Sequence, residues 1–128
     1  LTGRFYYDRP ALSSEALHVN TSYITAVAND YAYDLIYSRL ISGIGKKGDV
    51  LIGLSTSGNS GNVVNALIKA KEMGITTVGF TGEGGGKMKE HCDLLIDIPS
   101  HDTPRILECH MLLGHTVCEI VETTLFPK

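Results

Sequence analysis

Hydroxyl side chains and a glycine are concentrated in one run of six residues. The run consists of Ser55, Thr56, Ser57, Gly58, Asn59 and Ser60. It follows an apolar segment at residues 50–54 and precedes a segment whose apolar residues have helical spacing. A loop between the carboxyl end of a strand and the start of a helix presents free N–H groups and the positive end of a dipole, which favour an anion. The hydroxyls add donors without bulk, and Gly58 lets the backbone approach a ligand.

The kind of anion is limited by what the run lacks. It has neither the lysine of a Walker A motif nor a GxGxxG pattern, so no nucleotide cofactor is predicted. A monophosphate on a small metabolite fits best, with Ser55, Thr56, Ser57 and Ser60 as its predicted ligands. The alternative is a serine-rich turn that only caps the following helix.

Histidine is the side chain that titrates near neutral pH, and the chain has five. His115 lies in a long apolar segment with helical spacing, one turn before Glu119 and two turns after Glu108. From the residues alone it is either a proton-transfer group or a histidine paired at an interface. The other histidines, at positions 18, 91, 101 and 110, show no spacing typical of a metal cluster, and His110 is interpreted as a helix-packing residue.

The elements that must position these residues follow from the apolar pattern. Residues 50–54 and 75–80 predict strands and residues 63–73 the helix between them, which makes a βαβ unit with parallel strands. The other predicted elements are strands at 16–19 and 94–98 and helices at 21–27, 30–44, 87–91 and 103–125. Asp30 would cap the second of these helices. The last helix is apolar nearly all round, so part of its burial is expected from another subunit.

Length and composition describe one globular domain. The 128 residues, 43% hydrophobic and 20% charged, suit a single core. The net charge of −3 without a basic cluster gives no support for a nucleic-acid surface. The longest uncharged run, residues 50–68, is too rich in serine and asparagine for a membrane span. Three cysteines, Cys92, Cys109 and Cys118, lack CxxC spacing and are predicted to be reduced thiols, which favours the cytoplasm.

Six segments of the chain resemble the sugar isomerase (SIS) domain family, and more closely its phosphoheptose isomerases. They are residues 1–4, 28–31, 48–60, 81–82 with the glycines that follow, 103–106 and 110–115. The loop at 55–60 identifies only the broad family, whereas its combination with Asn29-Asp30 and the last helix is more specific. The resemblance implies one SIS domain over residues 1–128. Its fold would be a three-layer, flavodoxin-like α/β/α sandwich with a mostly parallel sheet.

The resemblance also implies roles for individual residues. Ser55, Thr56, Ser57 and Ser60 would hold the phosphate of a sugar phosphate. Asn29 and Asp30 match positions that contact the sugar. His115 matches the catalytic histidine, which also ligates zinc in some members. Family members are homotetramers with active sites at subunit boundaries.

Two departures from the family pattern concern the chemistry. The family's catalytic glutamate immediately precedes the segment that here begins at Leu1, and a glycine-serine loop lies further upstream. The domain is therefore expected to be incomplete at its N-terminus and inactive as this chain alone. Leu107 stands where the family usually has a glutamine that contacts the substrate or the metal, and leucine offers neither a donor nor an acceptor.

Two functions are compatible with these residues. The first is the interconversion of sedoheptulose 7-phosphate and D-glycero-D-manno-heptose 7-phosphate through an enediol, in bacterial heptose and lipopolysaccharide synthesis. The second is a non-catalytic SIS protein of the replication-initiator-associating type, which binds a sugar phosphate or a protein partner. His115 favours the enzyme. Leu107 and the ending at residues 124–127 favour the binding protein.

Overall fold

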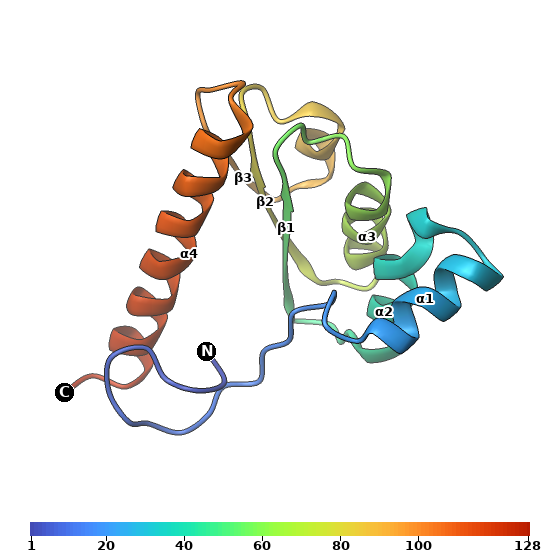
Figure 1. Cartoon of the computed structure of the whole chain (residues 1–128). Helices are drawn as coiled ribbons and strands as arrows, with labels where there is room; N and C mark the ends of the chain where they lie inside the picture. Colours follow the sequence, from blue (N-terminus) through green and yellow to red (C-terminus); the bar gives the residue numbers. More distant parts are fainter.

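Three parallel strands form the centre of the computed structural model, which describes residues 1–128 (Figure 1). The strands, adjacent in chain order, are β1 (Val50–Ser55), β2 (Thr76–Thr81) and β3 (Leu94–Asp97). Val50 lies opposite Thr76, and Val78 lies opposite Leu94. The helix α3 (Gly61–Glu72) connects β1 to β2, and the 3-10 helix η2 (Gly86–His91) connects β2 to β3. The predicted βαβ unit and the strand that follows it are confirmed.

Helices lie on both sides of the sheet, which makes three layers (Figure 1). On one side are α1 (Thr21–Asp30), α2 (Ile36–Ile44) and α3, with the 3-10 turn η1 (Tyr33–Leu35) between α1 and α2. The long helix α4 (Thr103–Leu125) lies on the other side. The predicted α/β/α architecture with a parallel sheet is confirmed, and α4 has the predicted bounds.

The core is densest between the sheet and the pair of helices α2 and α3. Ile41, Ala66, Ala70 and Ile75 form one buried cluster there. The close approach of α3 to the sheet depends on Gly53, where an added Cβ would lie 2.9 Å from Val63 Cγ1. These contacts fix the start of α3 above the carboxyl end of β1, which is where the run of hydroxyl residues begins.

Three predicted elements differ from the structure. No strand forms at residues 16–19, which make a turn in which the Val19 N–H donates to the Ala16 carbonyl (3.2 Å). Leu17 alone reaches the core cluster, so this short segment has one apolar anchor and no strand partner. The first helix, α1, runs three residues further than predicted and ends at Asp30. Asp30 therefore does not cap the next helix. The helix predicted over residues 30–44 is replaced by the turn η1 and the shorter α2, which begins at Ile36.

No helix in the structure combines the length and the apolar character needed to span a bilayer. No disulfide joins the three cysteines.

Candidate functional site

The run of hydroxyl residues forms the loop between β1 and α3, as predicted. Ser55 ends β1 with 7% of its surface exposed, and Ser60 immediately precedes α3. The Ser55 Oγ lies 2.9 Å from the Ser60 Oγ and 3.4 Å from the Ser57 Oγ. Three hydroxyls therefore converge at the N-terminal end of a helix, where backbone N–H groups and the helix dipole attract anions.

Ser60 occupies the N-cap position of α3, but its side chain makes no capping hydrogen bond. It interacts with Ser55 instead. The interpretation of this loop as a simple serine-rich cap is therefore not supported, because the hydroxyl best placed to cap the helix faces its neighbours in the loop.

A glycine-rich loop after β2 supports the hydroxyl loop from the side. The Met88 N–H donates to the Gly58 carbonyl, and the Lys87 N–H donates to the Asn59 Oδ1, both at 2.9 Å. Gly58 has a φ of +69°, and a Cβ at this position would collide with the backbone of Gly85. The two loops therefore form one unit whose contact requires glycine at position 58.

A cavity of about 460 Å³ opens beside this unit, at the carboxyl end of the sheet. Its walls come from the hydroxyl loop, the glycine-rich loop and the start of α4. The lining residues are Thr56, Ser57, Asn59, Glu83, Gly84, Gly86, His101, Thr103 and Ile106. Residues at the N-terminal ends of two long helices thus meet at one cavity, which favours a negatively charged group within it.

Glu83 and His101 belong to this cavity, and the sequence analysis did not single them out for it. The His101 Nε2 lies 2.6 Å from the Glu83 Oε2. Both residues belong to segments between the later elements. Glu83 lies two residues after the end of β2, and His101 lies two residues before the start of α4. Their position after the carboxyl ends of parallel strands was the available signal, since such loops share one edge of the sheet.

Asn29 and Asp30 lie elsewhere in the single chain. They are exposed at the end of α1, where the Asn29 Nδ2 donates to the Asp30 Oδ1 (3.0 Å), and neither lines the cavity. The structure therefore does not bring the predicted sugar-contacting residues to the hydroxyl loop of their own chain.

His115 also lies outside the cavity of its own chain. It is exposed on α4, nine residues beyond Ile106, which corresponds to about 14 Å along the helix axis. No ion pair joins it to Glu119 or Glu108, and Glu108 instead accepts from Arg105 (2.6 Å). The ring of Phe5 lies beside it, and the centroids of the two rings are 6.2 Å apart.

His110 is a packing residue, as predicted. It is 3% exposed, and its Nε2 lies 3.0 Å from the carbonyl oxygen of Thr81 at the end of β2. Its ring also lies against Phe80, with centroids 5.8 Å apart. His110 thereby ties α4 to the strand whose following loop lines the cavity.

The residues of one chain do not fit a zinc site. No three His, Cys, Asp or Glu side chains lie close enough together to hold a metal ion. Leu107, next to the cavity residue Ile106, is half exposed and has no ligating atom. Because zinc in proteins is usually held by three or four side chains, no step proposed below depends on a metal.

A family model and several curated proteins match this chain. Residues 1–82 match the family model described as SIS domain. The phosphoheptose isomerase of Burkholderia pseudomallei is 54% identical over 125 residues, which cover 98% of this chain and 64% of that protein. The phosphoheptose isomerase of Clostridium acetobutylicum is 54% identical over 123 residues, which cover 96% of this chain and 63% of that protein. The chain thus spans less than two thirds of the length of these curated relatives.

Two solved structures share the fold. A phosphoheptose isomerase from Neisseria gonorrhoeae superposes with a TM-score of 0.86 and 40% identity, covering 88% of this chain and 63% of that one. A phosphoheptose isomerase from Francisella tularensis superposes with a TM-score of 0.92 and 30% identity, covering 96% of this chain and 66% of that one.

Proposed function

The chain belongs to the SIS domain family, and from this premise we propose that it serves the isomerisation of sedoheptulose 7-phosphate to D-glycero-D-manno-heptose 7-phosphate. The observation that carries the proposal is the convergence of the Ser55, Ser57 and Ser60 hydroxyls at the start of α3, beside a polar cavity. The names of the relatives support the same activity.

The cavity suits a phosphorylated sugar. Its volume of about 460 Å³ falls in the range of small-molecule sites. The phosphate would lie at the hydroxyl loop, where Thr56 adds a fourth hydroxyl and the start of α3 contributes N–H groups. Glu83 would repel a phosphate, so its carboxylate suits the sugar hydroxyls instead, and the exposed imidazole of His101 lies beside it.

Isomerisation of an aldose to a ketose moves a proton between adjacent carbons through an enediol. One group takes the carbon-bound proton and another exchanges protons with the oxygens. We assign the second task to His115, because an imidazole gains and loses a proton near neutral pH. The first task falls to the glutamate that the family places immediately before the segment beginning here at Leu1.

A homotetramer with active sites at subunit boundaries is part of the proposal. His115, Asn29 and Asp30 lie outside the cavity of their own chain, so another chain would have to supply such groups to it. Five large apolar side chains of α4 are between 50% and 67% exposed in the single chain: Leu107, Met111, Leu112, Ile120 and Leu125. An apolar surface of this kind is typical of a subunit interface. The cytoplasm, where sugar phosphates and reduced thiols occur, is the proposed location.

Turnover of sedoheptulose 7-phosphate by the full-length protein tests this function, with His115→Ala as the companion variant. We expect conversion to the aldose by the wild-type protein and a decrease of roughly 100- to 10,000-fold in the variant. Binding of the sugar phosphate without turnover would instead identify a non-catalytic SIS protein. Equal turnover by both proteins would remove His115 from the mechanism.

A further inference from the structure

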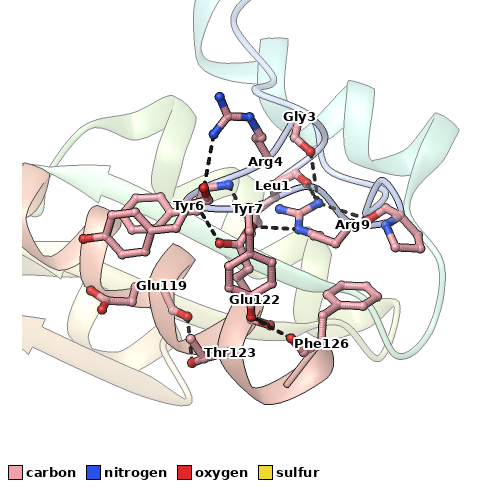
Figure 2. A network of polar contacts seen from close by, with 12 residues as sticks. Leu1, Gly3, Arg4, Tyr6, Tyr7, Arg9, Glu119, Glu122, Thr123 and Phe126 are labelled. Carbon is pink, nitrogen blue, oxygen red and sulfur yellow. Dashed lines mark hydrogen bonds and ion pairs between the residues drawn. The ribbon is translucent and has the colours of Figure 1, made fainter. Parts of the chain in front are cut away.

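Glu122, near the end of α4, is a fully buried carboxylate that the proposed site does not use (Figure 2). Its Oε1 accepts from the Phe5 N–H (2.8 Å) and its Oε2 from the Tyr6 N–H (2.6 Å). The Arg9 Nε donates to Oε1 at 3.0 Å. Burial alone would raise the pKa of Glu122, but these hydrogen bonds outweigh it and hold the pKa below its usual value. The carboxylate is therefore an ionised anchor.

The donors to this anchor belong to residues 1–9, which we term the N-terminal strap. The side chain of Arg9 is 2% exposed, and its Nη1 donates to the carbonyls of Leu1 (2.6 Å) and Gly3 (3.1 Å), which closes the strap on itself. The Tyr7 hydroxyl donates to the Phe126 carbonyl (2.6 Å) just beyond α4. Figure 2 shows these contacts gathered around the last turns of α4. The strap is thus fixed to α4 chiefly through Glu122.

Phe5 links this anchor to the proposed proton-transfer group. Its N–H is bound by Glu122, and its ring lies 6.2 Å from the His115 ring, with a tilt of 56° between the two planes. His115 lies seven residues before Glu122, two turns earlier on the same face of α4. The His115 imidazole makes no hydrogen bond or ion pair within the chain, and the Phe5 ring is the aromatic group beside it.

We propose that Glu122 is a positioning residue for His115, because it holds Phe5 where the phenyl ring sets the orientation of the imidazole. The importance of that orientation for catalysis rests on the proposed function. The contact itself does not, since the environment of His115 can be measured without turnover.

The test compares Glu122→Gln with Phe5→Leu and their double variant in the full-length protein. The amide introduced by Glu122→Gln has nearly the size of the carboxylate but turns an NH₂ group, in place of one acceptor oxygen, toward the donors of the strap. Phe5→Leu removes the ring and leaves the Glu122 hydrogen bonds in place. Glu108→Gln is the matched control, because it changes another glutamate of α4 that pairs with an arginine but is exposed.

Two readouts are used. The first is the NMR resonance of the His115 ring, assigned with His115→Ala, and the second is kcat and KM for sedoheptulose 7-phosphate. We expect Glu122→Gln and Phe5→Leu to shift the His115 resonance and lower kcat roughly 10- to 100-fold, with KM changed less than about twofold. The double variant should be no worse than the worse single variant, and Glu108→Gln should match the wild type.

A folded Glu122→Gln protein with the wild-type His115 resonance would overturn the inference. If Glu122→Gln does not fold, Phe5→Leu decides, and an unchanged resonance in that variant would overturn it as well. Absence of turnover in the wild-type protein, with the resonance shifts as expected, would reject the proposed function and leave the positioning contact established.

Discussion

Gly58 is the residue at which the two loops of the candidate site touch. Its left-handed backbone, with φ of +69°, is one that other residues adopt at a cost, and the space for a Cβ is filled by the Gly85 backbone. The hydroxyls of Ser55, Ser57 and Ser60 can converge only if this turn keeps its shape. At the scale of the residue, the shape of the loop thus depends on the absence of a side chain at position 58.

Gly58→Ala is expected to destabilise the protein by about 1–3 kcal/mol and to weaken phosphate-ester binding. Urea unfolding and titration calorimetry measure the two effects. Gly43→Ala is the control, because Gly43 lies in α2 with no atom within 4 Å of an added Cβ. There we expect a change within about 1 kcal/mol, in the stabilising direction. A Gly58→Ala protein as stable as the control would contradict the account of the loop.

The helix α4 carries different contacts at its two ends. Near its start, Ile106 is 2% exposed and His110 contacts the Thr81 carbonyl, which sets the helix against the end of β2. Near its end, Glu122 holds the N-terminal strap. At the scale of the element, α4 therefore connects the edge of the sheet that forms the cavity to a segment at the opposite end of the sequence.

The lowered pKa of Glu122 makes stability depend on pH. A carboxyl whose pKa is lower in the folded state contributes stability that is fully present above its unfolded pKa, about 4.3. That contribution is lost as the pH falls through the lower folded value. We expect the wild-type free energy of unfolding to decrease more between about pH 5 and pH 2 than that of Glu122→Gln. Urea unfolding at several pH values checks this.

Glu108→Gln serves again as the control. The Glu108 side chain is exposed, so its replacement should leave the dependence of the unfolding free energy on pH close to that of the wild type. Parallel profiles for the wild type and Glu122→Gln would show that Glu122 is not the group responsible.

The whole molecule leaves much apolar surface uncovered. Besides the side chains of α4, Val50, Ile52 and Leu54 of β1 are 62%, 40% and 51% exposed. They alternate with Leu51, Gly53 and Ser55, so they point to the face of the sheet away from α3. At this scale, the face of the sheet away from α3 is only partly covered by the chain itself, which supports the proposed assembly.

Charged substitutions on α4 test that assembly. Leu112→Glu and Ile120→Glu are expected to convert a homotetramer into smaller species, because a buried unpaired carboxylate disfavours an interface. Both residues are more than half exposed in the single chain, so the fold should persist. Light scattering gives the mass and circular dichroism the fold. Ser22→Glu, on the exposed side of α1, should leave the mass unchanged. A wild-type monomer would contradict the prediction.

The elements were predictable because their signals are local. Apolar spacing within short segments determined the βαβ unit and the bounds of α4, and the hydroxyl loop is a contiguous run. The turn at residues 16–19 was misread as a strand because a short apolar segment does not reveal whether a partner strand lies beside it.

Local sequence patterns could not predict the Glu122–Arg9 contact or the Glu83–His101 pair. Each joins segments that only the folded chain brings together, and the partners in the first are 113 residues apart in sequence. His115 shows the opposite case. The family resemblance implies a role for it, yet the fold of one chain places it outside the cavity, and in the proposed assembly the cavity that it serves belongs to another chain.

Binding of the phosphate by the Ser55–Ser60 loop is tested most directly by the dissociation constant of sedoheptulose 7-phosphate. Titration calorimetry would compare the wild type, the double variant Ser57→Ala/Ser60→Ala, and Ser22→Ala as a surface control. Two lost hydrogen bonds to a charged group predict roughly 100-fold weaker binding or more by the double variant. The control should bind like the wild type. A double variant that is folded and binds within about twofold of the wild type would contradict the account.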